Sequence, residues 1–115
     1  MNMNVSTMCL ADLDDVVELE RLSFPTPWSR DAFRDELTNN SRATYLVVRD
    51  SHGTAVAYGG FWLIFDEAHV TNVAVHPAHR RRGIGCMLMI TLMYSALAKG
   101  ALRMTLEVRV SNHGA

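Results

Sequence analysis

The sequence predicts a single α/β domain over residues 1–115, built on a mixed, largely antiparallel sheet flanked by helices. The chain is long enough for one domain, and 49% of its residues are hydrophobic against 20% charged, as in globular proteins. Three consecutive strand-like runs are joined by short turns, which favours antiparallel pairing. A long helical run then separates the third of these strands from a last one, and such a crossover places two strands parallel.

The N-terminal part of the chain predicts one short strand and one helix. Met3–Cys9 is the candidate strand. Asp12 is expected to cap the following helix, with Asp15 reaching back to it as in a capping box. Apolar residues at helical spacing continue to about Ser23. The Phe-Pro-Thr-Pro segment at 24–27 then ends the helix, because a residue that precedes proline avoids the helical region.

A second helix is expected over Arg30–Thr38. Ser29 is its N-cap, and Trp28 stands where it can pack on Phe33 as a hydrophobic staple. The remaining elements are strands at Thr44–Arg49, Ala55–Phe65 and Ala68–Val75, a turn at Asp66-Glu67, a helix at Gly83–Lys99 and a strand at Leu102–Val110. The predicted order is therefore β-α-α-β-β-β-α-β.

The segment His76–Gly85, between the Ala68–Val75 strand and the long helix, has the character of a phosphate-binding turn. The first N–H groups of a helix have no intrahelical partner, and the helix dipole favours an anion beside them. Gly83 and Gly85 let a ligand approach the backbone, and Arg80–Arg82 add positive charge. A solvated basic loop in front of a core helix is the alternative interpretation. Neither the GxGxxG pattern nor the P-loop pattern is present.

The composition of the whole chain narrows the range of partners. A formal net charge of −1 and a pI near 6.5 give no general footprint for nucleic acid or a membrane, so the local basic cluster suits a small phosphorylated ligand. Cys9 and Cys86 are expected to be buried, reduced thiols. Among the histidines only His76 and His79 have metal-ligand spacing, and they flank a loop with no third ligand, so we expect no metal. Because no leader pattern and no apolar run of about 18 residues is evident, we expect a cytoplasmic protein.

Four segments resemble one family of enzymes. The Arg-x-x-Gly-x-Gly spacing of Arg80–Gly85 resembles the pyrophosphate loop of the GCN5-related N-acetyltransferase (GNAT) superfamily, whose members use acetyl-CoA. Asp66–Val75 resembles the fourth strand of that family, and Phe24–Ser29 resembles the start of its second helix, beside the acceptor groove. Leu106–Asn112, followed by Ala115, resembles the LEVRxSNxxA motif of RimI-type ribosomal-protein alanine N-acetyltransferases.

The resemblance assigns roles to particular residues. In the family, the backbone at the end of the fourth strand holds the pantetheine arm and the turn holds the pyrophosphate. It therefore implies that the cofactor-binding residues are Val73, Ala74, Val75, Arg80, Arg81, Arg82, Gly83, Ile84, Gly85, Cys86 and Asn112. It also implies that Glu107 is the general base, which takes a proton from the acceptor's α-ammonium so that the amine can attack the thioester.

Two other interpretations of the acidic residues stay open. Strand periodicity alone makes Glu107 a solvent-exposed carboxylate between polar neighbours. Glu67, at the start of the expected fourth strand, is a rival base because other branches of the superfamily use a carboxylate on that strand. The Asp66-Glu67 pair also has the character of a plain hairpin turn.

The resemblance also implies elements that the 115 residues do not contain. Family members continue with a helix, a closing β-hairpin and a tyrosine that acts as general acid on the leaving CoA thiolate. None of Tyr45, Tyr58 and Tyr94 stands at a matching position. We therefore expect an incomplete domain, missing the C-terminal helix and hairpin, whose final strand exposes an apolar face and an open edge. Such an edge favours self-association.

The sequence thus leads to the hypothesis of an acetyl-CoA-dependent N-acetyltransferase. Its acceptor would be the N-terminal α-amine of a ribosomal protein, with alanine as the acceptor residue, and the amine would attack the thioester directly. One alternative is a catalytically inactive acyl-CoA-binding fragment. Another is an acetyltransferase that acts on a lysine or on a small-molecule amine. Neither nucleic acid nor a membrane is expected as a partner.

Overall fold

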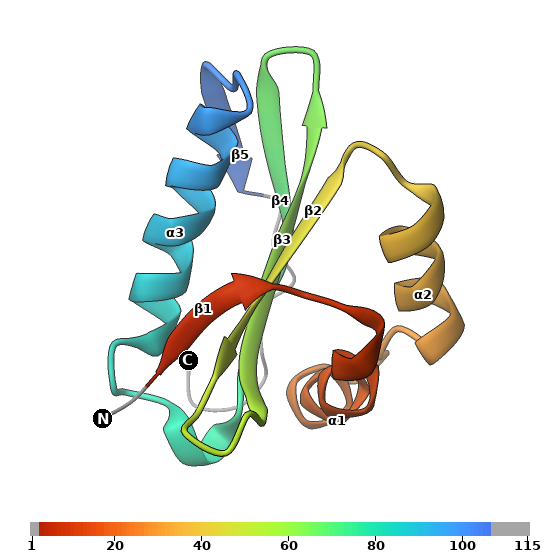
Figure 1. Ribbon diagram of the computed structural model, residues 1–115, viewed down its shortest axis with the longest axis vertical. Coiled ribbons are helices and arrows are strands. Elements are labelled where there is room, and N and C mark those ends of the chain that lie inside the picture. Colours follow the sequence, from red (N-terminus) through yellow and green to blue (C-terminus); the bar gives the residue numbers. More distant parts are fainter. Residues whose placement is uncertain (1–2, 107–115) are drawn as a thin grey trace.

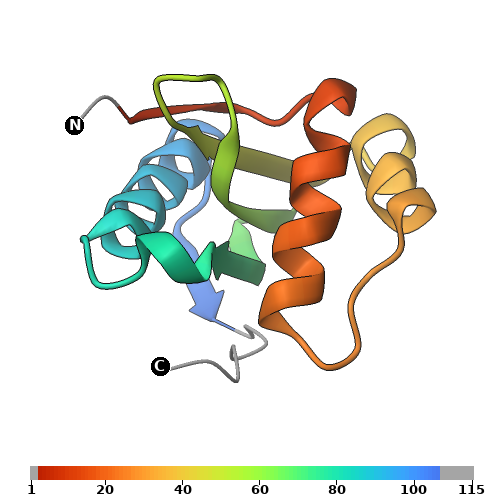
Figure 2. The same cartoon turned by 90° about the horizontal axis from the view of Figure 1, so that it is seen from below.

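A sheet of five strands forms the middle layer of the protein, with α3 on one face and α1 and α2 on the other (Figure 1, Figure 2). The computed structural model describes residues 3–106. The strands are β1 (Asn4–Thr7), β2 (Ala43–Arg49), β3 (Ala55–Ile64), β4 (Glu67–Val75) and β5 (Arg103–Leu106). The helices are α1 (Leu13–Ser23), α2 (Arg30–Asn39) and α3 (Ile84–Ala98), with short 3-10 turns η1 (Leu10–Asp12) and η2 (Pro77–His79).

The strands lie in the order β1-β2-β3-β4-β5, and every neighbouring pair is antiparallel except β4 and β5, which are parallel. The helix α3 connects these two parallel strands, as a crossover requires. The predicted fold class and order of elements are confirmed. Within residues 3–106, no helix is long and apolar enough to cross a membrane.

Each face of the sheet buries its own core, and the side chains of a strand alternate between the two. In β2, Leu46 and Val48 pack with the residues of α3. Their neighbours Tyr45 and Val47 pack with the residues of α1 and α2. Both faces of the central strands are therefore covered, and β2 and β3 are almost continuous apolar runs.

The start of α2 follows the prediction. Ser29 is the N-cap, and its hydroxyl oxygen accepts a hydrogen bond from the Ala32 N–H at 3.1 Å. Trp28 packs on Phe33 with the ring centroids 5.3 Å apart, which is the expected staple. Phe33 also meets the buried Tyr58 ring edge to face at 5.5 Å, so the staple fixes α2 on the sheet.

The start of α1 differs from the prediction. Asp12 makes no side-chain cap for α1; its carboxylate accepts the Cys9 N–H at 2.9 Å and closes the preceding turn η1. Arg49 of β2 explains the difference, since its Nη2 atom lies 2.5 Å from Asp12 Oδ2. Asp15 accepts the Ala55 N–H at 3.0 Å and so fastens α1 to the start of β3. The expected capping box of Asp12 and Asp15 is therefore wrong.

Two further expectations are corrected. Glu67 is the first residue of β4, because the hairpin is closed by a two-residue turn of Phe65 and Asp66, in which Phe65 has a φ of +56°. Cys9 and Cys86 are exposed, so the expectation of buried thiols is wrong. Cys86 lies in the first turn of α3, and a helix that is apolar on all sides does not reveal from its sequence which side meets the sheet.

The strand β4 contains one residue more than the part of β3 that it pairs with. Gly60 pairs with Asn72 and Phe61 with Val70, so Thr71 is an extra residue that forms a bulge. A shift of one residue exchanges the faces of a strand. The α3 core therefore receives even-numbered residues before the bulge and odd-numbered ones after it, namely Ala68, Val70, Val73 and Val75.

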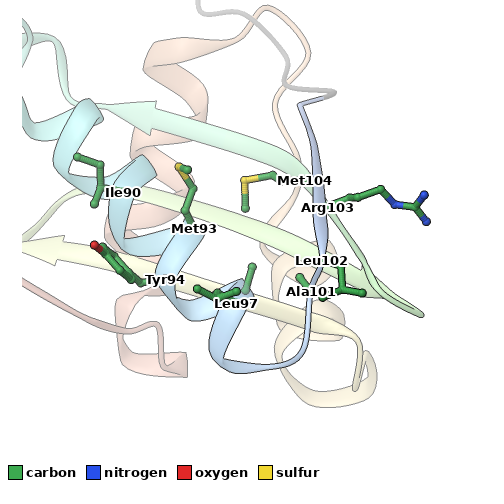
Figure 3. A pocket seen from close by; sticks show the side chains of 9 residues that line it. Ile90, Met93, Tyr94, Leu97, Ala101, Leu102, Arg103 and Met104 are labelled. Atoms are coloured by element: carbon green, nitrogen blue, oxygen red, sulfur yellow. The ribbon is translucent and has the colours of Figure 1, made fainter.

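An open apolar groove runs between α3 and the segment that enters β5 (Figure 3). Its volume is about 580 Å³ and its lining residues are Ile90, Met93, Tyr94, Ala96, Leu97, Ala101, Leu102, Arg103 and Met104. Leu97 and Leu102 are 64% and 78% exposed. Contiguous apolar surface of this kind marks an interaction site or promotes association. In the described sheet β5 is also an edge strand.

We predict that the 115-residue chain self-associates through this groove and the β5 edge. The double substitution Leu97→Lys and Leu102→Lys places charge in the groove, so it should shift the chain towards the monomer. Sedimentation velocity over a series of protein concentrations measures this. Leu10→Lys is the matched control, because Leu10 is 49% exposed in η1, next to α1 on the opposite face of the sheet from the groove. A wild-type chain that stays monomeric at every concentration would contradict the prediction.

Candidate functional site

The loop between β4 and α3 is fixed at its first residues. The His76 N–H donates to the Val56 carbonyl at 2.8 Å, which ties the loop to β3. The His76 Nδ1 atom accepts a hydrogen bond from the Ala78 N–H at 3.1 Å and thereby caps η2. Pro77 is the first residue of that turn, where its fixed φ suits the backbone and its missing N–H has little cost. The chain therefore enters the basic loop from a defined starting point.

The start of α3 offers backbone donors to an anion. Gly83, its N-cap, has a left-handed backbone with a φ of +76°, and Arg81 has a φ of +64°. Met87 makes the first intrahelical hydrogen bond, donating its N–H to the Gly83 carbonyl at 3.0 Å. The N–H groups of residues 84–86 precede it and have no carbonyl one turn earlier. Together with the helix dipole, they form a site that suits a phosphate.

The three arginines of the loop have different surroundings. Arg80 is partly buried: its Nε donates to the Val75 carbonyl at 3.1 Å, and its Nη2 lies 3.5 Å from the Ser23 hydroxyl oxygen. Arg80 therefore links the loop to the end of β4 and to α1. Arg81 and Arg82 are exposed near the helix N-terminus, where their charge attracts an anion. The sequence pattern alone predicts one basic cluster of three equivalent arginines, and the structure separates Arg80 from the other two.

The last part of β4 presents an edge that leads into this loop. In the described part of the chain, β5 pairs with β4 only over Glu67–Val70, whereas β3 pairs with β4 along its length. Val73–Val75 follow and run directly into the loop. The start of α3 lies against the same strand end, since a Cβ on Gly85 would be 3.6 Å from Val75 Cγ2. An extended ligand along this edge would therefore meet the helix N-terminus.

The expected base and one expected cofactor contact, Glu107 and Asn112, lie outside the described residues. The rival base Glu67 lies at the start of β4. Its carboxylate is 2.7 Å from His69 Nε2 and 3.7 Å from Arg103 Nε. At about 3.3 Å per residue, Glu67 stands roughly 26 Å from the loop end of the strand. The structure thus brings the expected residues of the strand end, the loop and the helix start together, and leaves Glu67 apart from them.

Two acidic residues on the α1 and α2 face make hydrogen bonds that no motif reveals. Glu36 of α2 accepts the Tyr45 hydroxyl at 2.7 Å and the Trp62 Nε1–H at 2.6 Å. Glu20 of α1 is fully buried and accepts the Tyr58 hydroxyl. The signal for Glu20 was available in the sequence, because it is a carboxylate at a core-facing position of the apolar stripe of α1.

The hydroxyls of Tyr45 and Tyr58 make hydrogen bonds in the core beneath α1 and α2. Burial, and next the hydrogen bond to Glu36, raise the pKa of Tyr45, so its hydroxyl stays protonated and acts as a donor. Tyr58 is completely buried and donates to Glu20. Tyr94 is 69% exposed in the apolar groove of α3. Tyr45 and Tyr58 therefore serve the packing of α1 and α2 on the sheet.

The described residues also give no cluster of metal ligands. Among residues 3–106, no three His, Cys, Asp or Glu side chains gather closely enough to hold a metal ion. His76 and His79 stand edge to face with their ring centroids 6.0 Å apart.

The fold agrees with a comparison to known proteins. The model of the acetyltransferase (GNAT) family matches residues 13–115, and the chain therefore belongs to that family. Members of this family transfer acetyl groups from acetyl-CoA, and this chain is an N-acetyltransferase.

Several proteins named as alanine N-acetyltransferases are similar in sequence to this chain over most of its length. A Bacillus subtilis (strain 168) protein, provisionally named [ribosomal protein bS18]-alanine N-acetyltransferase, is 41% identical over 96% of this chain and 73% of its own length. The [ribosomal protein bS18]-alanine N-acetyltransferases of Salmonella typhimurium and Escherichia coli (strain K12) are each 30% identical over the same shares.

Solved structures agree with the fold. The crystal structure of the ribosomal-protein-S18-alanine N-acetyltransferase from Escherichia coli superposes with a TM-score of 0.83 at 27% identity, over 97% of this chain and 70% of that one. An aminoglycoside N-acetyltransferase in complex with CoA gives a TM-score of 0.78 at 16% identity, over 94% of this chain and 78% of that one, which shows likeness of fold alone.

We predict that Gly83→Val weakens acetyl-CoA binding by about tenfold or more, because a left-handed backbone costs a side chain about 1–2 kcal/mol and more for a β-branched one. Arg81→Ala should have a smaller effect, since other positive charge remains. Gly100→Val is the matched control: Gly100 also has a left-handed backbone, with a φ of +98°, but it lies beyond the far end of α3. Isothermal titration calorimetry measures the three affinities. Equal affinity in the wild type and Gly83→Val would contradict the phosphate-loop assignment.

Proposed function

We propose that this N-acetyltransferase acetylates the N-terminal α-amine of ribosomal protein bS18, with alanine as the acceptor residue. The relatives that carry this name in their own species support the proposal, at 41% and 30% identity over 96% of the chain. The observation that carries the cofactor part of the proposal is the meeting of the β4 edge with the N-terminus of α3.

The cofactor would lie along β4 and end at α3. We infer that its pantetheine arm runs beside the backbone of Val73–Val75, which within the described residues has no β5 partner. Its pyrophosphate would take the N–H groups of residues 84–86, with Arg81 and Arg82 supplying charge. The partly buried Arg80 would hold the loop in place. Asn112 is a further proposed contact, on the strength of the motif around it alone.

The proposed base is Glu107. The acceptor's α-ammonium has a pKa of about 7.7–8.0, so much of it is protonated at neutral pH and cannot attack a carbonyl. Bound acetyl-CoA supplies an activated acyl group as a thioester. Glu107 would take one proton from the ammonium, directly or through a water molecule, and leave the free amine as the nucleophile. Glu67, whose carboxylate lies beside His69 and Arg103 at the far end of β4, is the weaker candidate.

We predict that Glu107→Gln lowers kcat for acetylation of a peptide copied from the N-terminus of bS18 by about 10²–10⁴-fold, the usual contribution of a general base. Its affinity for acetyl-CoA should stay unchanged, because the amide keeps the size of the side chain. Glu67→Gln is the matched control and should keep kcat within about threefold. Steady-state kinetics and calorimetry measure the two properties separately. Loss of activity in Glu67→Gln together with full activity in Glu107→Gln would reverse the assignment.

The acceptor is tested with a panel of amines. The wild-type chain should prefer the free N-terminus of the bS18 peptide over the same peptide with a blocked N-terminus and an added lysine, and over a small-molecule amine. Preference for either of these would favour an acetyltransferase of other specificity. Tight acetyl-CoA binding without turnover on any amine would favour an acyl-CoA-binding fragment.

A further inference from the structure

Glu20 is a carboxylate at the centre of the molecule. It lies in α1 and none of its surface is exposed to solvent. One of its oxygens accepts the hydroxyl of Tyr58 in β3, and the other accepts the backbone N–H of Trp28 at 2.6 Å. Trp28 is in the loop that connects α1 to α2. A single side chain thus joins a helix, the central sheet and a connecting loop.

The burial of this carboxylate calls for a reason other than packing. Taking an acidic group out of water is unfavourable unless hydrogen bonds compensate, and a leucine at this position would fill the same space without that cost. What leucine cannot do is accept two hydrogen bonds. The specific contribution of Glu20 is therefore to fix the positions of the two groups that donate to it, the Trp28 N–H and the Tyr58 hydroxyl.

The hydrogen bonds continue from Tyr58 to β4. The Tyr58 hydroxyl oxygen is 3.4 Å from the Nδ2 atom of Asn72, which donates to it. Asn72 is fully buried and directly precedes Val73, the first residue of the proposed pantetheine edge. A hydroxyl that donates once and accepts once gives the chain of bonds a fixed direction, from Asn72 through Tyr58 to Glu20. The same carboxylate also holds Trp28, so the loop and the β4 edge share one anchor.

The helices on the two faces of the sheet limit the directions from which an acceptor can reach the β4 edge. The helix α3 covers one face of the sheet, as Figure 1 shows, so an acceptor must come to the β4 edge from the side of α1 and α2 or along the edge. The loop of residues 24–29 lies on that side and sweeps from the end of α1 to α2 (Figure 2). Its position relative to β4 therefore affects how an acceptor meets the acyl group.

We propose that Glu20 is a positioning residue for the acceptor. It fixes the position of the loop of residues 24–29 relative to the β4 edge, because it binds Trp28 in the loop and is connected through Tyr58 to Asn72 in β4. This inference rests on the proposed function, because it takes the β4 edge as the path of the cofactor. Glu20 touches neither substrate. It acts on acceptor binding through the loop, and it has no part in holding the cofactor.

The test compares Glu20→Leu and Glu20→Gln with the wild type. The leucine variant should raise the acceptor peptide's KM by about tenfold, because the loop loses its bond from Trp28. The Kd for acetyl-CoA should change by less than about threefold, because the end of β4 stays held by its backbone pairing with β3. The glutamine variant should recover part of the loss, because its carbonyl can still accept the Trp28 N–H, whereas its NH2 group cannot accept the Tyr58 hydroxyl. Glu18→Gln is the control, on the same helix but exposed and paired with Arg21.

A second readout needs no turnover. The Kd of the acceptor peptide for the complex with CoA, measured by fluorescence anisotropy, should rise in Glu20→Leu and stay near the wild-type value in Glu18→Gln. Unchanged peptide KM and Kd in folded Glu20→Leu would overturn the inference and leave the proposed function standing. Parallel losses of peptide and acetyl-CoA affinity that follow a drop in Tm would also overturn it, since they indicate a structural role. A wild-type chain that neither acetylates nor binds the peptide would contradict the proposed function and this inference together.

Discussion

The bulge at Thr71 is the feature on which the arrangement of the site depends. By adding one residue to β4, it exchanges the two faces of the strand. Val73 and Val75 then pack under α3, and Asn72 enters the core on the other face, beside Tyr58. Without the bulge the regular alternation would continue, and the strand end would present the opposite side chains to α3. The contact of the α3 start with Val75 would then be lost.

Two backbone features next to each other make up the proposed cofactor site. One is a strand end that, in the described residues, pairs with β3 alone, and the other is a helix N-terminus whose first N–H groups have no carbonyl to bind. Both offer backbone groups to a ligand, which fits the two glycines of the motif. The arginines of the motif add positive charge beside these groups. Arg80 adds the connection between them, because it reaches both the Val75 carbonyl and the Ser23 hydroxyl.

Local patterns predicted the elements, and long-range contacts account for what they did not predict. Ser29 and the Trp28–Phe33 staple are local, and both are confirmed. Asp12 fits the local rule for an N-cap equally well, but Arg49 on a distant strand pairs with it, and it closes a different turn. The bulge at Thr71 leaves no mark in the sequence, because valine and threonine suit a strand on either side of it.

Part of the proposed site could be located from the sequence. The loop follows from glycine spacing and positive charge, which have a direct physical meaning there, and the strand end follows from the resemblance to the family's fourth strand. The separate environment of Arg80 could not be predicted, since Ser23 is 57 residues away in the chain. The core-facing position of Glu20 could be predicted, but its hydrogen-bond partner could not, because Tyr58 is 38 residues away. The roles of Glu107 and Asn112 follow from the resemblance and remain predictions.

We propose that the β4 edge and the start of α3 form one continuous cofactor site. Titration of the ¹⁵N-labelled chain with CoA, followed by amide chemical shifts, tests this proposal. The largest shifts are expected at the amides of Val73–Val75 and of residues 83–86, and these shifts should saturate together with a single Kd. Shifts concentrated instead along the apolar groove of α3, around Met93 and Leu97, with the loop unchanged, would contradict it.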